Sequence, residues 1–274
     1  MENKNGLFDK IITYIVLTFA SLTILLPILW IIRTSMANRR IAYKIPPQWV
    51  FDPTIENYVA IFKDLNFLHF FMNSLIISLL SSLIAVMLAA VAAYSIARFK
   101  TGGTSLNVFI LSTYMLPPII LIIPLFILVK SLGLLDTRLA VIIAYAGIHL
   151  PLLIWMMIGF FQGIPEALDE SAMVDGCTRF QAFTKVILPV TAPGVIASFV
   201  MSFILAWNEF IIALIITGKT SRTLSVALST LSTHQGVKIA ELSAAIVLTI
   251  LPIIALSFFI QRYLVYGLTF GAVK

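Results

Sequence analysis

The sequence predicts an all-α membrane protein with six transmembrane helices, and three observations support that prediction. Hydrophobic residues make up 60% of the chain and charged residues only 11%, whereas a soluble domain is about 45–50% apolar and about 25% charged. Long uncharged segments recur along the chain, and the charges gather between them. No soluble domain of 274 residues has enough interior to bury so much apolar surface. The composition therefore excludes an ordinary soluble enzyme, a disordered chain and a nucleic-acid-binding domain.

Six segments are long enough to span a bilayer, since about 20 apolar residues cross a hydrocarbon core of about 30 Å. The first segment is not a cleaved signal peptide, because its apolar core is too long and Arg33 follows it without a small-residue cleavage site. An even number of spans puts both termini on the same side of the membrane. The expected spans are 11–32, 70–97, 105–129, 139–163, 190–216 and 242–262.

Prolines interrupt these segments. A proline lacks the N–H that a helix interior uses and clashes with the preceding turn. Two interpretations stay open: kinks that let the spans splay and close, and the general tolerance of membrane helices for proline. The prolines concerned are Pro27, Pro117, Pro118, Pro124, Pro151, Pro189, Pro193 and Pro252.

The net charge of +6 comes from 18 Lys and Arg against 12 Asp and Glu. We interpret it as loop charge that faces anionic lipid or a partner. It does not orient the chain: with the termini inside, eight Lys and Arg lie inside and ten outside, five of them in the loop 33–69. The single cysteine, Cys177, allows neither an internal disulfide nor a cysteine metal site.

Two of the three long loops carry weaker signals than the third. The loop 33–69 contains a short amphipathic stretch that we expect to lie as a helix at the membrane interface. Its apolar residues at helical spacing are Ile55, Tyr58, Val59 and Phe62. The loop 217–241 is rich in Ser and Thr. Either it dips into a cavity or reaches a soluble partner, or it is a plain solvated linker.

The third loop, 165–189, has the local signals of two short helices. Pro165 suits a first helical turn. Three acids that favour a helix N-terminus follow it: Glu166, Asp169 and Glu170. Gly176 offers a helix stop, and Thr178 with Gln181 three residues later is typical of a capping box. We expect a hairpin of two short helices that meet at Gly176; an ordinary connection between spans is the alternative.

The same loop resembles the EAA loop of the integral-membrane subunits of bacterial ABC importers. In that family Glu-Ala-Ala is followed by three residues, Gly, nine residues, Ile, any residue and Leu-Pro. The corresponding residues here are Glu170-Ser171-Ala172, Gly176 and Val186-Ile187-Leu188-Pro189, and all the spacings match. The departures are Ser171 for Ala and Val186 for Ile.

The resemblance extends over nearly the whole chain. It is closest to the carbohydrate-uptake branch of the family, specifically to the second permease of maltose-type transporters. The matching stretches are Pro27-Ile28-Leu29-Trp30, Glu56-Asn57-Tyr58, Asn73-Ser74-Leu75, Ala93-Tyr94-Ser95-Ile96-Ala97-Arg98, Gly133-Leu134-Leu135-Asp136-Thr137, Ala206-Trp207-Asn208-Glu209-Phe210 and the tail 267–274.

This resemblance implies a mechanism. One transmembrane domain, residues 1–274, pairs with a homologous second permease in the bacterial cytoplasmic (inner) membrane. Two cytoplasmic ATPase subunits dock on the EAA loops and bind ATP and Mg, so that this chain holds no cofactor, and an external binding protein delivers the sugar. Closure of the ATPases flips the path from inward-facing to outward-facing. The hairpin 165–189 and both termini are then cytoplasmic. The sequence itself has no Gly-rich phosphate loop of Walker type.

The resemblance also implies roles for residues. Glu170 stands where the family's motif Glu is available to a basic residue of the ATPase groove. Gly176 lets the hairpin seat without a side chain in the way, and Ala172 keeps the docking face shallow. The tail 271–274 also reaches the ATPases, and the loop 217–241 reaches toward the binding protein. The implied coupling residues are Glu166, Glu170, Ala172, Asp175, Gly176, Phe180, Leu188 and Pro189.

Polar groups inside the spans are the candidates for the substrate path, because burying them in a membrane is costly. A sugar path needs uncharged hydrogen-bonding groups and aromatic faces. The candidates are Asn73, Tyr114, Tyr145, His149, Asn208 and Glu209. The alternatives are that Glu209 pairs with a neighbouring helix or with the partner permease, and that His149 bonds a carbonyl freed at Pro151. Ser81-Ser82 and Ala89–Ala93 are expected to be helix-packing surfaces.

Two other classes of membrane protein are alternatives to a permease, and each predicts its own sequence features. A secondary transporter or channel predicts charged relays, inverted repeats or broken helices at mid-membrane. A membrane-embedded enzyme predicts clustered His, Asp or Glu, whereas His69, His149 and His234 lie in distant segments. For the substrate, a disaccharide or short oligosaccharide is the expectation that the resemblance gives, and a glycerol-phosphate ester is the alternative.

Overall fold

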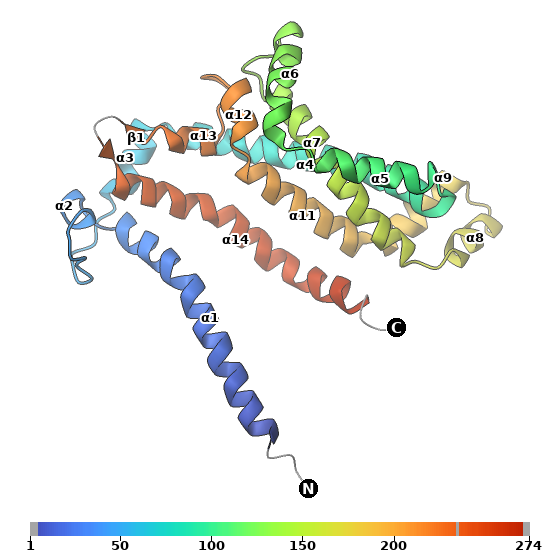
Figure 1. Cartoon of the computed structure of the whole chain (residues 1–274), viewed down its shortest axis with the longest axis horizontal. Helices are drawn as coiled ribbons and strands as arrows, with labels where there is room; N and C mark the ends of the chain where they lie inside the picture. The colour runs from blue at the N-terminus through green and yellow to red at the C-terminus, as the bar shows by residue number, and fades with distance from the viewer. Residues whose placement is uncertain (1–4, 234–235, 271–274) are drawn as a thin grey trace. The chain divides into compact units, whose positions relative to one another are not determined.

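The computed structural model describes residues 5–233 and 236–270. The tail 271–274, expected to reach the ATPases, lies outside the described residues. The described part is helical apart from two short antiparallel strands, which confirms the all-α prediction. Figure 1 shows the elements, whose bounds are α1 Asn5–Ser35, α2 Arg39–Ala42, α3 Glu56–Asp64, α4 Phe67–Phe99, α5 Gly103–Tyr114, α6 Pro118–Ser131, α7 Arg138–Gln162, α8 Ala167–Val174, α9 Arg179–Ala182, the π-helix η1 Phe183–Ile187, α10 Leu188–Val190, α11 Ala192–Asn208, α12 Ile211–Ile216, α13 Leu224–Ser229, β1 Ser232–Thr233, β2 Gly236–Val237 and α14 Ile239–Phe270.

Four described helices are long and apolar enough to cross a membrane by themselves: α1, α4, α7 and α14. They coincide with four of the six expected spans. Two further candidates are pairs of helices that meet at a sharp bend, 86° between α5 and α6 and 78° between Arg179–Val190 and α11. The chain therefore has four such helices, or up to six if each bent pair is one span, and the count of six stays a prediction.

The bend between α5 and α6 divides the segment 105–129, which the sequence analysis treats as one span. Pro118 is the first residue of α6, and Pro117 before it has φ −58° and ψ 128°. A residue that precedes proline is pushed out of the helical region because its backbone clashes with the proline ring. Two prolines in succession therefore end one helix and start another, instead of only kinking it.

The expected fifth span, 190–216, is also divided. Its first helix, α11, ends at Asn208, and Glu209 takes an extended conformation with ψ 128°. The Glu209 carboxylate accepts a hydrogen bond from the backbone N–H of Ile212 at 3.1 Å. It thereby occupies one of the free donors at the start of α12, as N-terminal caps do.

The described residues form two compact units. In the unit that contains Met1–Phe67 and Leu228–Leu251, a buried amide fixes the loop after α1. The Asn57 side chain donates to the carbonyls of Ser35 and Ala37, both at 2.8 Å. The helix expected near residue 55 is present as α3, with Asn57 and Ile61 buried. Most of the expected apolar stripe is exposed, and its contact with a membrane interface stays a prediction.

The core of the other unit, Leu68–Ala227 with Pro252–Lys274, is built on small residues of α4. Ala85, Ala89 and Ala93 are fully buried at successive turns and belong to the same cluster as Leu153 and Phe161 of α7. Small side chains of this kind let helices approach closely. Ser81 and Ser82 are buried as well, so the expected packing surfaces are confirmed.

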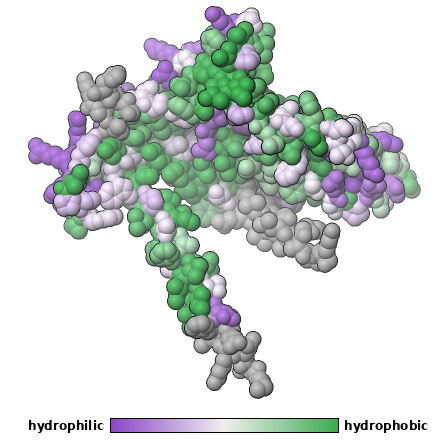
Figure 2. Space-filling model, in the orientation of Figure 1, coloured by the Kyte–Doolittle hydropathy of each residue, from purple (hydrophilic) through white to green (hydrophobic). Residues whose placement is uncertain are grey.

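Much apolar surface has no partner among the residues that the structure describes. In the most apolar window of α1 none of the residues is buried, and Figure 2 shows hydrophobic side chains over the visible face of this helix. Phe19 and Ile24 are exposed on it, as are Phe109 of α5 and Ile123 of α6. Contiguous exposed apolar surface of this extent marks contact with lipid or with another protein.

The packing of α7 against α11 generates a stability prediction. A Cβ added to Gly194 of α11 would lie 2.4 Å from Cγ of the Phe160 ring on α7. We expect Gly194→Ala to destabilise the protein by about 1–3 kcal/mol through overpacking, measured as a lower melting temperature in detergent. Gly159→Ala is the matched control, because its added Cβ meets nothing within 4 Å. An equal melting temperature for Gly194→Ala and the wild type would contradict this packing.

Candidate functional site

The candidate site is the hairpin formed by α8 and α9, and local sequence signals build it. Gly176 ends the first helix with φ +87°, a left-handed conformation that favours glycine. Thr178 and Gln181 form the expected capping box: each side chain accepts a hydrogen bond from the other residue's backbone N–H. Pro165 lies two residues before α8, which begins at Ala167, so it precedes the first turn rather than occupying it.

The hairpin has an inner and an outer face. Asp169, Ala172 and Ala182 are buried against the rest of the unit. Val174 and Phe180 project outward with 87% and 70% of their surface exposed. Among the coupling residues expected from the sequence, six are exposed: Glu166, Glu170, Asp175, Gly176, Phe180 and Pro189.

Two of the expected coupling residues lie elsewhere. The family resemblance implies that Ala172 lies on the docking face, but it is buried, and it therefore packs the hairpin inward. Its carbonyl accepts a hydrogen bond from the N–H of Cys177 at 3.0 Å, which closes the turn. Leu188 is half-buried and packs against the apolar cluster that contains Phe183 and Ile187. The outer face is thus made by Val174, Phe180 and acids.

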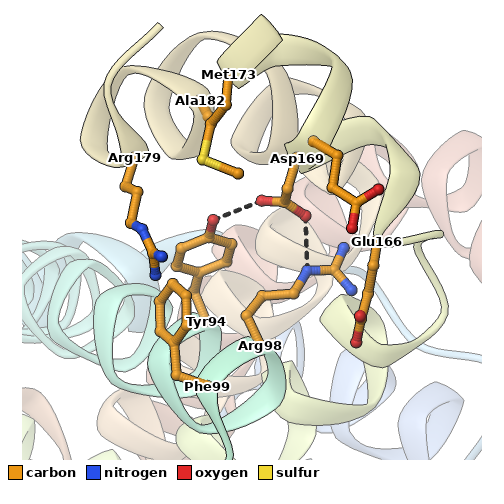
Figure 3. Close-up of a pocket in the computed structure, with 9 residues that line it drawn as sticks. Tyr94, Arg98, Phe99, Glu166, Asp169, Met173, Arg179 and Ala182 are labelled. Atoms are coloured by element: carbon orange, nitrogen blue, oxygen red, sulfur yellow. Dashed lines mark hydrogen bonds and ion pairs between the residues drawn. The ribbon is translucent and has the colours of Figure 1, made fainter.

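A pocket of about 140 Å³ that contains several charged side chains lies between the hairpin and the end of α4 (Figure 3). Asp169 of α8 points into it. Its Oδ2 lies 2.8 Å from Nε of Arg98, and its Oδ1 accepts a hydrogen bond from the Tyr94 hydroxyl. Arg98 also donates from a terminal guanidinium nitrogen to the carbonyl of Ile164, at 2.8 Å. One arginine of α4 therefore holds both α8 and the linker that precedes it.

The second helix of the hairpin also contacts α4. The Arg179 guanidinium lies over the Phe99 ring, 4.9 Å from its centre, within the range of cation–π attraction. Tyr94 packs its ring against Phe183 at 4.7 Å and Phe161 at 5.8 Å between ring centres. Sequence reasoning did not assign a role to Tyr94 or Arg98. Both lie in a stretch that carries the family resemblance, and that was the available signal.

Three of the substrate-path candidates lie close to one another. Tyr145 is buried in α7 and donates to the Glu209 carbonyl at 3.3 Å. The His149 ring lies 6.1 Å from the Tyr145 ring. Nδ1 of His149 is buried and has no hydrogen-bond partner within the described part of the chain. Tyr145, His149 and Glu209 therefore form one group of polar residues, of which Tyr145 and His149 are buried and Glu209 is half-buried.

The other three candidates have separate surroundings. Asn73 is fully buried, and its side-chain amide forms its hydrogen bonds within the chain. It donates to the carbonyls of Thr220 and Arg222, both at 2.9 Å, and accepts from Nε of Arg138 at 2.8 Å. Asn73 therefore holds a loop instead of offering groups to a sugar. Asn208 and Tyr114 are exposed near the ends of α11 and α5.

Asp136 is a structural acid that sequence reasoning missed. Its carboxylate accepts hydrogen bonds from the backbone N–H groups of Gly218, Thr220 and Ser221 at 2.8–3.0 Å and from the Ser221 hydroxyl at 2.8 Å. Burial raises the pKa of this carboxyl, but the bonds from Ser221, Thr220 and Gly218 outweigh burial and hold it well below its usual range. Nothing local in the sequence around Asp136 marks a partner 82 residues away.

Comparison with known proteins identifies the family. A family model described as "Binding-protein-dependent transport system inner membrane component" matches residues 85–269. The chain belongs to this family. The permease is 33% identical to the trehalose/maltose transport system permease protein of Thermococcus litoralis, over 99% of each chain. It is 38% identical to the trehalose transport system permease protein of Mycobacterium tuberculosis, over 91% of this chain and 92% of that one.

The fold has a solved counterpart. A chain of a bacterial ABC transporter that imports the acidic polysaccharide alginate aligns with a TM-score of 0.78 at 20% identity, over 96% of this permease and 99% of that chain. Family membership confirms two predictions. The permease is an inner membrane component, and it is a transport subunit, not an enzyme.

The Asp136 site generates a prediction about pH. Since the folded pKa is lowered, the carboxylate adds stability that is fully present above the ordinary Asp pKa of about 3.9 and is lost as the pH falls through the lower folded value. We expect Asp136→Asn to cost about 1 kcal/mol of unfolding free energy at pH 7, the net value of a typical hydrogen bond. Melting temperatures at pH 7, 5 and 3 measure this: the gap to the wild type should hold from pH 7 to 5 and narrow at pH 3.

The exposed Asp52 provides the control. Asp52→Asn should leave the melting temperature unchanged at every pH. A gap for Asp136→Asn that widens toward pH 3 would contradict the assignment.

Proposed function

We propose that this permease is the transmembrane subunit of an ATP-driven ABC importer for a carbohydrate, with a disaccharide or oligosaccharide as substrate. The hairpin of α8 and α9 carries the proposal. It combines the Glu170 to Pro189 spacing of the EAA loop with an outer face that presents Phe180, Val174 and free acids. The carbohydrate class rests on the relatives, which are named as trehalose and maltose permeases.

The outer face suits a protein partner. An exposed aromatic side chain that enters a partner's groove is the kind of residue that dominates binding energy. Phe180 and Val174 are large, exposed and apolar, and the exposed acids Glu166, Glu170 and Asp175 belong to the same loop. We infer an ATPase groove with an apolar floor and a basic rim as the occupant. ATP and Mg are then bound by two ATPase subunits, on the cytoplasmic side where both termini also lie.

The remaining partners follow from the other surfaces. The exposed apolar faces of α1, α5 and α6 fit lipid and a homologous second permease. The family is binding-protein-dependent, so an external sugar-binding protein is the partner on the opposite side, where the loop 217–241 lies. Closure of the ATPases moves the hairpins and alternates the access of a path between the two permeases. The group of Tyr145, His149 and Glu209 is the remaining candidate on that path.

A secondary transporter or channel subunit for a small polar solute is the alternative. The broken helices α5–α6 and α11–α12 are the observation that favours it, since such breaks occur at the binding sites of secondary transporters. The two functions differ in their dependence on ATP. The test uses proteoliposomes that contain this permease, the second permease and the ATPase subunits, with the binding protein outside. These vesicles should take up labelled maltose or trehalose only when ATP is enclosed in the lumen, where the ATPase subunits face. Uptake by this chain alone, indifferent to ATP, would contradict the ABC importer.

Gly176→Arg tests the hairpin. A side chain at φ +87° costs about 1–2 kcal/mol of strain. The Gly176→Arg substitution also adds a large charged group to the proposed docking face. We expect ATP-dependent sugar uptake to fall at least tenfold, because about 1.4 kcal/mol of lost docking is already tenfold. Radiolabelled uptake measures it.

Gly133→Arg is the matched control. Gly133 has φ +67°, and an added Cβ there meets nothing within 4 Å, as at Gly176. It lies outside the hairpin, so the variant carries the same backbone strain and should keep uptake. Equal uptake by both variants would contradict a docking role for Gly176.

A further inference from the structure

We infer that α4 is the strut that carries motion of the hairpin across the membrane, and that Asp169 is the positioning residue that fixes the hairpin to it. This inference rests on the proposed function, since it needs an ATPase to move the hairpin. The chain itself joins the hairpin only to α7 and α11. A fixed contact with α4 adds a third helix to those that must move with the hairpin.

The inner end of the strut is a charged contact shielded from water. Only 6% of the Arg98 side chain and 12% of the Asp169 side chain are exposed. A carboxylate buried this far must keep its charged and hydrogen-bonding partners, because an unpaired buried charge is very costly. Arg98 and Tyr94 are those partners (Figure 3). The hairpin therefore cannot separate from α4 without leaving a buried ion unpaired.

Further contacts keep the hairpin from rotating about that one residue. Arg98 binds the Ile164 carbonyl before α8, and Arg179 of α9 lies over Phe99, the last residue of α4. The contacts lie at three places along the hairpin, and all reach the last turns of α4. Hairpin and helix end therefore move as one body.

The helix between the two ends is suited to transmit a displacement. Of the four long helices in the described part of the chain, α1, α7 and α14 contain a proline and α4 contains none. Proline is the commonest cause of a sharp kink. Asn73 and Tyr94 of α4 are 21 residues apart, about 32 Å at 1.5 Å per residue. That distance matches the hydrocarbon core of about 30 Å.

The outer end of the strut holds a second loop. Asn73 donates to the carbonyls of Thr220 and Arg222, and the Ser74 hydroxyl accepts from the N–H of Leu224 at 2.7 Å. Asp136 fixes the same loop from the start of α7. A displacement of α4 therefore displaces the loop 217–224, which under the proposed function faces the binding protein.

The test places a reporter at the far end of α4. The background is the complete transporter with Cys177→Ser in this chain. A fluorophore is attached through Lys219→Cys, at an exposed position, and the shift of its emission spectrum on adding ATP and Mg is recorded. We expect the shift in the background protein and its loss, by fivefold or more, in Asp169→Asn. Asp169→Glu, which keeps the carboxylate, should restore at least half of it. Asp52→Asn is the control and should leave it unchanged.

Three further measurements make the result decisive. ATPase subunits should co-purify with Asp169→Asn in wild-type amounts. The basal rate of ATP hydrolysis should persist in this variant, but sugar-loaded binding protein should no longer raise it, so that the rates with and without binding protein are about equal. Tyr94→Phe removes one hydroxyl and keeps the packing of the ring, and it should reduce the spectral shift partly.

An undiminished spectral shift in assembled Asp169→Asn and in Tyr94→Phe would overturn the role of α4 as the strut. Loss of the ATPases from Asp169→Asn, with a normal shift in Tyr94→Phe, would also overturn it, since Asp169 would then serve only docking. Absence of any ATP-dependent shift or uptake in the background protein would instead refute the proposed function.

Discussion

The buried ion pair between Arg98 and Asp169 is the interaction on which the arrangement of the hairpin depends. An exposed ion pair contributes little, but a buried pair that loses one partner leaves an uncompensated charge. Asp169 is buried on the inner face of α8 and faces α4, whereas Glu166, Glu170 and Asp175 are exposed. Four acids within ten residues thus divide into one buried acid that fixes the hairpin and three exposed acids, which under the proposed function are accessible to the ATPase.

The second constraint is the apolar surface that the chain leaves uncovered. A helix such as α1, exposed and apolar along its most hydrophobic stretch, has no stable place in water. Under the proposed function, lipid and a second permease supply its surroundings, and assembly completes the packing of the subunit. Small residues on α4 and the close contact of Gly194 with Phe160 fix the helices of the larger unit.

Features encoded locally were predictable from the sequence, and features that depend on distant partners were not. The capping box at Thr178 and the stop at Gly176 need only neighbouring residues, and both are present. The two prolines at 117–118 signalled an interruption, but its 86° bend depends on packing as well. Ala172 and Asn73 have the expected chemistry in unexpected places, because burial is decided by elements far along the chain. Asp136 was missed for the same reason.

Capture of the partner at the outer face of the hairpin tests the central claim most directly. A photo-reactive phenylalanine analogue is placed at position 180 in membranes that contain the whole transporter, with position 109 of α5, equally aromatic and exposed, as the comparison. The account predicts that irradiation links position 180 to an ATPase subunit and position 109 to lipid or the second permease. An ATPase adduct at neither position, or at 109 and not at 180, would contradict it.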